Sequence, residues 1–286
     1  MTRLRVDHET SYVYEQDVLC SSHLAYLRPR NTDRQRWLKH EILIEPEPTC
    51  RQVRTDIFGN EVLAFAVERE YRSFRVATSG EVEVDAQAPV AGTPAWEDVA
   101  AEVVRSLEAS KTAFASPYAH VDETVRTYAR ASFGRGRPVF DVARDLMTRI
   151  HADCRYAPGT TRIGDQPADI LRMRQGVCQD FAHLMVAALR SHGLSCRYVS
   201  GYLRTYPPPG MPKLVGCDAT HAWVSVWCGP EKGWIEFDPT NDRLAGEDHV
   251  VLAWGRDFGD VSPLKGVITG GGNSTLRVAV NVDAVS

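Results

Sequence analysis

One segment determines how the middle of the chain folds: Gly176-Val-Cys-Gln-Asp-Phe-Ala-His-Leu-Met-Val-Ala-Ala-Leu-Arg-Ser-His-Gly193. Its apolar residues recur at the spacing of one face of an α-helix: Phe181, Leu184, Met185, Ala188 and Leu189. Gly193 then supplies a helix stop. The pattern therefore predicts an amphipathic helix that has Cys178 in its first turn.

The position of Cys178 at the start of a helix favours a reactive thiol. Free backbone N–H groups and the helix dipole at a helix N-terminus stabilise a thiolate, which is the nucleophilic form of cysteine. A neighbouring imidazole would hold such a sulfur as an ion pair at neutral pH. The alternative is a buried structural cysteine, the most common fate of this residue type. Cys178 alone does not decide between the two interpretations.

Two of the strands expected after this helix begin or end with residues that suit a cysteine enzyme. The expected strands are 196–203, 221–227 and 234–237. His221 begins the second strand, and Asp238, before Pro239, follows the third. Taken separately, each has an ordinary explanation, as a strand-end histidine and as a turn residue. Their occurrence together with Cys178 is what favours a triad.

The register of the last two strands decides whether His221 and Asp238 can meet. If the turn between them places Gly229 opposite Lys232, paired residue numbers sum to 461, and Asp238 then lies opposite Trp223. Trp223 and His221 share a face, so Asp238 is a diagonal neighbour of His221. A register with an even sum would put the two on opposite faces. A Cys-His-Asp triad therefore requires the odd register or a bulge.

The N-terminal part of the chain has a different pattern. Between residues 3 and 84, short segments with alternating apolar residues are separated by turn signals, which predicts an antiparallel β-sandwich or partial barrel. Pro89, Gly92 and Pro94 indicate a linker, and helical periodicity begins at Trp96. We therefore expect an α+β chain with a β domain at 1–85, a linker at 86–95 and a core at 96–286. A closing strand at 276–282 is assigned to the core.

Composition excludes several classes of protein. The 286 residues include 33 Lys plus Arg and 37 Asp plus Glu, with a pI near 6.1, so nothing indicates binding to nucleic acid or to an anionic membrane. No apolar run is long enough to span a bilayer, and residues 1–6 contain no hydrophobic signal core, so we expect a cytoplasmic protein. Seven cysteines without a framework spacing indicate reduced thiols.

Four short motifs resemble the bacterial transglutaminase-like superfamily, which includes cysteine proteases. They are Gly176-Val-Cys178-Gln-Asp180-Phe-Ala182, Arg197-Tyr-Val-Ser-Gly-Tyr202, Thr220-His221-Ala-Trp223 and Asp238-Pro-Thr240. The resemblance covers residues 151–240, and residues 3–84 resemble the β domain that often precedes this core. It implies a papain-like fold, with helices on an antiparallel sheet, and a triad of Cys178, His221 and Asp238.

The resemblance also limits what can be inferred about the reaction. Animal transglutaminases carry Trp directly after the nucleophile, where this chain has Gln179. The family therefore implies amide-bond chemistry through a thioester, without choosing between water and an amine as the second nucleophile.

Further residues are expected near the nucleophile. The backbone N–H of Cys178 should form one half of an oxyanion hole, and Tyr156 or Gln179 is the candidate for the other half. Tyr156 has the alternative of packing its ring at an edge. Asp180 either contacts the substrate or complements the helix dipole. Trp223 either lines an acyl groove or belongs to the core.

The sequence thus predicts a cysteine-dependent enzyme that hydrolyses a peptide or protein amide through a thioester. The alternatives are acyl transfer to an amine and a catalytically silent binding module. No cofactor is needed for this chemistry. A metal site is not predicted, because His151 with Cys154, and Cys217 with His221, lack the paired cysteines of zinc motifs.

Overall fold

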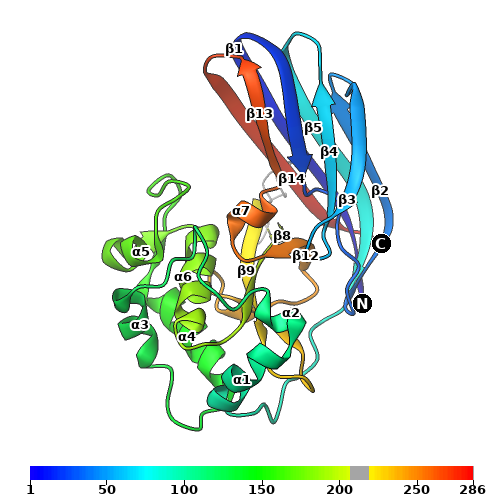
Figure 1. Cartoon of the computed structure of the whole chain (residues 1–286). Coiled ribbons are helices and arrows are strands. Elements are labelled where there is room, and N and C mark those ends of the chain that lie inside the picture. Colours follow the sequence, from blue (N-terminus) through cyan, green and yellow to red (C-terminus); the bar gives the residue numbers. More distant parts are fainter. Residues whose placement is uncertain (207–218, 286) are drawn as a thin grey trace.

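The computed structural model describes residues 1–206 and 219–285. Long antiparallel strands form one end of the molecule, and a mixed helix-and-sheet part forms the other (Figure 1). This arrangement confirms the predicted α+β class with an antiparallel β domain. Among the described residues, no helix is long and apolar enough to cross a membrane.

A single long strand, β1 (Thr2–Ala25), organises the β domain. Its first half pairs with β5 on one side and β14 on the other, and its second half pairs with β4 and β13. The pairing with β5 shifts register between Val13 and Val18, where one half of β1 gives way to the other. The other strands of this sheet are β2 (Gln35–Glu45), β3 (Cys50–Thr55), β4 (Glu61–Val67), β5 (Tyr71–Val84), β13 (Leu264–Gly270) and β14 (Ser274–Ala284).

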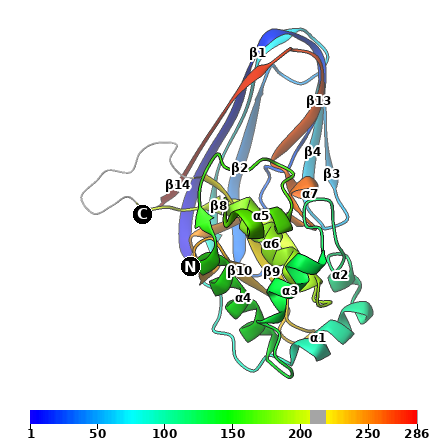
Figure 2. The ribbon, with the colours of Figure 1, turned by 90° about the vertical axis from the view of Figure 1, so that its left-hand side faces the viewer.

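The C-terminal strand belongs to this sheet, so the predicted boundary of the core at 286 is wrong. The predicted segment 276–282 is a strand, β14, but it pairs with residues 4–14 of β1, and β13 also pairs with β1. Both C-terminal strands lie along β1 (Figure 2). Alternation of apolar residues specifies which face of a strand is buried, and it leaves the pairing partner open.

The core is built on a second antiparallel sheet, in the order β11-β10-β9-β8-β12. Its strands are β8 (Cys196–Leu203), β9 (Ala219–Trp227), β10 (Trp234–Asp238), β11 (Arg243–Leu244) and β12 (His249–Gly255). Trp234 opposes Trp227 and Phe237 opposes Val224, so paired numbers sum to 461. The odd register required for a triad is therefore confirmed.

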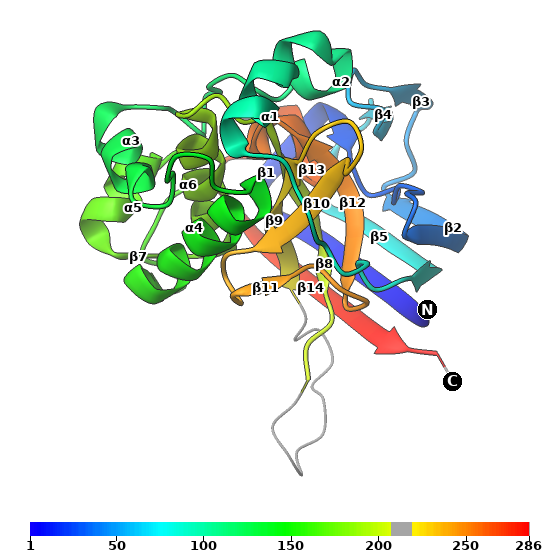
Figure 3. The same cartoon turned by 90° about the horizontal axis from the view of Figure 1, so that it is seen from below.

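Helices cover one face of this core sheet. They are α1 (Trp96–Glu102), η1 (Val103–Arg105), α2 (Leu107–Ser110), α3 (Glu123–Arg130), α4 (Val139–Asp153), α5 (Pro167–Met173), α6 (Cys178–Arg190) and α7 (Phe258–Val261). Residues 180–190 of α6 are all buried, because the helix contacts β8 and β9 as well as α3, α4 and α5. The strands of the N-terminal sheet lie on the other side of the core sheet (Figure 3).

The two parts share a continuous apolar interface. Leu4 and Val82 of the N-terminal sheet pack with Tyr202, Val250 and Leu252 of the core sheet in one buried cluster. Residues 86–94, the predicted linker, have no regular secondary structure. The core sheet is thus enclosed between helices and the N-terminal sheet, and its strand ends carry the site described next.

Candidate active site

The start of α6 is held in place by a capping interaction and a small parallel ladder. The ladder joins β6 (Arg155–Tyr156) to β7 (Gln175–Gly176). Asp180 Oδ2 accepts hydrogen bonds from the Val177 N–H (2.8 Å) and the Thr161 hydroxyl (2.7 Å). A side chain at Gly176 would approach the Asp180 side chain to 2.8–3.2 Å, which explains the glycine. Cys178, the first residue of the helix, is partly exposed.

This capping role corrects one expectation for Asp180. The residue is 4% exposed, and its carboxylate is occupied by the helix start and by Thr161. Burial raises the pKa of Asp180, and the hydrogen bonds from Val177 and Thr161 oppose that increase. The side chain therefore stabilises the helix that presents Cys178 and is not available to contact a substrate.

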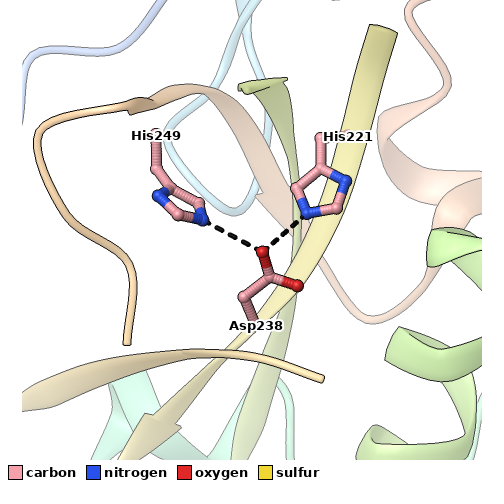
Figure 4. A group of neighbouring side chains, drawn as sticks. All are labelled: His221, Asp238 and His249. Atoms are coloured by element: carbon pink, nitrogen blue, oxygen red, sulfur yellow. Dashed lines mark hydrogen bonds and ion pairs between the residues drawn. The ribbon is translucent and has the colours of Figure 1, made fainter. Parts of the chain in front are cut away.

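His221 lies between Asp238 and Cys178. Its Nε2 is 2.8 Å from Asp238 Oδ2 (Figure 4), so Nδ1 is the ring nitrogen left for Cys178. Burial alone would lower the pKa of His221, but the hydrogen bonds and charges of Asp238 and Cys178 raise it to about 10. The imidazole is therefore protonated at neutral pH when its partners are ionised. The three predicted residues are brought together from α6, β9 and β10.

Asp238 is the most heavily hydrogen-bonded residue of the site. Its Oδ2 accepts from His221 Nε2 (2.8 Å), His249 Nε2 (3.1 Å) and Asn241 Nδ2 (2.7 Å). Its Oδ1 accepts from the backbone N–H groups of Thr240 (3.0 Å) and Asn241 (3.3 Å). Burial would raise the pKa of this carboxyl, but the hydrogen bonds from His221 and His249 hold it well below its usual range. Asp238 is thus an anion although it is fully buried.

Sequence reasoning missed His249 and Asn241. His249 begins β12, in the segment His249-Val-Val-Leu-Ala-Trp254, which resembles the part of β9 that begins at His221 in having a histidine followed by apolar residues. A histidine at the start of a second apolar run was the available signal. Asn241 lies three residues after Asp238, a spacing typical of a turn, and its position gave no other signal.

Tyr156 and Gln179 are the two candidates for the second oxyanion donor. Tyr156 is 52% exposed, and burial of its inner part, followed by the negative charge of Cys178, raises its pKa. The ring is therefore within electrostatic range of the sulfur. The side chain of Gln179, the second residue of α6, is partly buried.

Trp223 does not line a groove, which corrects a second expectation. Its side chain is fully buried and packs with Val199 and Val251, and its Nε1–H donates to Glu236 at 2.9 Å. A side chain at Gly201 would come within 2.4 Å of the indole ring. The tryptophan is therefore a core residue that supports the site from behind.

The described residues contain one group with three metal-binding side chains: His221, Asp238 and His249. The separations of 2.8 and 3.1 Å between nitrogen and oxygen are hydrogen-bond distances, shorter than the ~3.3 Å between ligands of tetrahedral zinc. The proton that His249 Nε2 must carry, because its Nδ1 accepts from the Gly246 N–H (3.1 Å), also blocks coordination. The arrangement does not fit a metal. Cys217, the partner considered for a zinc site, lies outside the described residues.

Comparison with known families agrees with the two-part architecture. Residues 126–239 match the transglutaminase-like superfamily, and residues 4–83 match the bacterial transglutaminase-like N-terminal region. An uncharacterized protein of Mycobacterium tuberculosis is 41% identical over 290 residues, which cover 98% of this chain and 92% of that protein. An uncharacterized protein of Mycobacterium leprae is 35% identical and covers 99% of each chain.

Two further comparisons bear on fold and activity. The crystal structure of a protein from Cytophaga hutchinsonii, named provisionally as a cysteine protease, superposes with a TM-score of 0.76 at 20% identity, over 100% of this chain and 91% of that one. This likeness shows the fold. A protein-glutamine gamma-glutamyltransferase of Pseudomonas aeruginosa is 41% identical over 68 residues, which are 23% of this chain and 10% of that protein.

Proposed function

The chain belongs to the transglutaminase-like superfamily, and on that premise we propose that it hydrolyses a peptide or protein amide through a thioester on Cys178. One observation carries the proposal. A buried imidazole, His221, is held by an ionised carboxylate on one side and acts on a partly exposed cysteine at a helix N-terminus on the other. This arrangement favours a thiolate–imidazolium pair at neutral pH.

The reaction follows from the protons that these groups hold. The Cys178 thiolate attacks the amide carbonyl, forming a C–S bond and a tetrahedral oxyanion. His221 Nδ1–H then protonates the leaving amine as the C–N bond breaks. The neutral imidazole next takes a proton from water, whose oxygen attacks the thioester, and the C–S bond breaks to release the acid. Thiolate and imidazolium are regenerated.

We propose Tyr156 as the second oxyanion donor, beside the backbone N–H of Cys178, with Gln179 as its competitor. The electrostatic effect of Cys178 on Tyr156 supports this choice, because it requires the phenol to lie near the sulfur. Loss of an oxyanion donor typically lowers kcat by about 10²–10³. Tyr156→Phe should have this effect and Gln179→Ala should not. The reverse result would assign the role to Gln179.

Acyl transfer to an amine is the second candidate reaction. It is favoured by the 68-residue match to a protein-glutamine gamma-glutamyltransferase. Hydrolysis is favoured by the partial exposure of Cys178, since water that reaches the thioester competes with any amine. The two differ in a single measurement. With a peptide-amide library, hydrolysis releases acid without added amine, whereas transfer gives product only when a primary amine such as dansylcadaverine is present.

The reactivity of the thiol tests the proposal without knowledge of the substrate. An ordinary exposed thiol is only ~0.1% ionised at pH 5.5. We therefore expect iodoacetamide to alkylate Cys178 at that pH at least about tenfold faster than the exposed Cys20 and Cys50, as measured by peptide mass spectrometry. Cys178→Ala should abolish turnover and Cys50→Ala should not. Equal alkylation rates at the three sites would favour a catalytically silent binding module.

We also propose that the protein works in the cytoplasm. The six cysteines within the described part of the chain are all free thiols, as a reducing compartment allows. Cell fractionation followed by immunoblotting tests this placement, and recovery of the protein outside the cytoplasm would contradict it.

A further inference from the structure

We propose that His249 is a positioning residue of the active site, which holds the Asp238 carboxylate in the orientation and charge state that His221 requires. The inference rests on the proposed function, since it assigns a role within the same site. His249 does not touch the nucleophile. It acts on His221 through the carboxylate that the two imidazoles share.

The first argument is geometric. One oxygen, Asp238 Oδ2, is 2.8 Å from His221 Nε2 and 3.1 Å from His249 Nε2, and the two rings approach it from opposite sides (Figure 4). The three residues come from β9, β10 and β12, three different strands of the core sheet. A carboxylate fixed by two imidazoles cannot rotate away from either one without losing a hydrogen bond inside a buried site.

The second argument concerns the proton on His249. Its Nδ1 accepts a hydrogen bond from the Gly246 N–H at 3.1 Å, and an accepting nitrogen carries no proton. The ring is therefore neutral and donates its single N–H to Asp238. Burial lowers the pKa of His249, and the hydrogen bond and charge of Asp238 oppose this only in part. The charges of His221 and of Arg243, from β11, lower the pKa of His249 further. The charge on the shared carboxylate is thus left to stabilise His221 alone.

The third argument is the packing of both rings on one indole. His249 lies edge-on to Trp223, with ring centroids 5.3 Å apart, and His221 is nearly parallel to it, at 6.0 Å. Trp223 is itself fixed by its hydrogen bond to Glu236. The His249 side chain is only 1% exposed, so a substrate cannot reach it. Its contribution to catalysis must therefore be transmitted by Asp238.

The test measures the pH dependence of Cys178 alkylation by iodoacetamide, which requires no substrate. His249→Leu removes the donor, and His249→Gln keeps an N–H near the position of Nε2. We expect His249→Leu to move the acid limb of the alkylation profile to higher pH and to lower the rate at pH 6 about tenfold. His249→Gln should restore most of the rate.

His183→Leu is the matched control, because His183 is a buried histidine like His249. It lies on α6 and accepts its hydrogen bond from the Phe258 N–H, so it does not contact the Asp238 carboxylate. It should lose stability and keep the wild-type pH profile. A folded His249→Leu variant with the wild-type profile would overturn the inference. A shift as large in His183→Leu would also overturn it, because the effect would then be one of general stability.

A second measurement keeps the inference testable if His249→Leu does not fold. Nitrogen-15 NMR of the histidine side chains in the wild-type protein should find His249 neutral at pH 7 with its proton on Nε2, and His221 doubly protonated. A charged His249, or a proton on its Nδ1, would overturn the inference. If wild-type Cys178 were alkylated no faster than Cys20 and Cys50, that different result would refute the proposed function itself.

Discussion

Replacing Gln35 should weaken the strand that carries His249, although Gln35 belongs to the N-terminal sheet. β12 is an edge strand of the core sheet, and Gln35 bonds to its outer edge as a neighbouring strand would. Gln35 Oε1 accepts from the Val251 N–H (2.7 Å), and Gln35 Nε2 donates to the Val251 carbonyl (2.8 Å). Asn60 pairs in the same way with Trp254, through bonds of 3.1 and 2.9 Å.

The size of the effect follows from the groups that would lose their partners. Gln35→Leu leaves the Val251 N–H and carbonyl buried without hydrogen bonds, and each such group costs about 1–3 kcal/mol. The free energy of unfolding should therefore fall by about 2–6 kcal/mol. For a chain of this size, that corresponds to a decrease of roughly 3–10 °C in Tm. Because Val251 lies two residues from His249, we also expect Cys178 alkylation at pH 6 to slow.

Urea unfolding followed by circular dichroism measures the stability change. Gln35→Glu is the sharper variant, since it keeps the shape and the acceptor but loses the donor and places a charge against the Val251 carbonyl. It should be at least as destabilising as Gln35→Leu. Gln52→Leu is the control, because Gln52 is exposed on β3 and should change stability by less than about 0.5 kcal/mol. Values that small for both Gln35 variants would refute the reasoning.

Three other changes have defined outcomes. Gly176→Ala should push the Asp180 carboxylate that caps α6 aside, which should lower the free energy of unfolding by about 1–2 kcal/mol in urea and slow Cys178 alkylation. Gly134→Ala is the control and should change neither quantity, because a Cβ there meets nothing within 4 Å. Asp238→Asn should lower the pKa of His221 and reduce alkylation at pH 6 more than tenfold; an unchanged rate would contradict the ion pair. Burial lowers the pKa of His23 to about 4, so the unfolded chain binds the proton first, and stability should be complete above about pH 6.5 and fall as the pH approaches 4. Thermal melts of wild type and His23→Phe at pH 7 and pH 5 test this, and an equal loss in both would assign the acid sensitivity to other groups.

The parts of the site that depend on local pattern could be predicted from the sequence. The apolar spacing after Cys178 specified α6. The alternation of strand residues left two kinds of register for β9 and β10, and the odd one, which the structure has, was identified in advance as the one that places Asp238 beside His221. Both are short-range properties, since a helix repeats every few residues and successive residues of a strand alternate between its two faces.

The parts that depend on distant segments could not be predicted. The alternation of strand residues placed Trp223 on the face that carries His221. The burial of Trp223, however, results from packing against β8 and β12. The same limit explains β14, whose alternating pattern gave its strand but not its partnership with β1. His249 was missed for a related reason, because β12 joins the sheet beyond β8 and approaches Asp238 only when the sheet is assembled.

These long-range contacts make the N-terminal sheet part of the support of the site. Leu4 and Val82 of that sheet share a core with Val250 of β12, and Gln35 and Asn60 satisfy backbone groups on the outer edge of the same strand. The C-terminal strands β13 and β14 in turn complete the sheet around β1. A core cut at the linker would therefore expose an apolar face and an unpaired edge of β12, the strand whose first residue holds the Asp238 carboxylate. The N-terminal region that accompanies the core in this chain thus supports the geometry of Asp238 and His221 through β12.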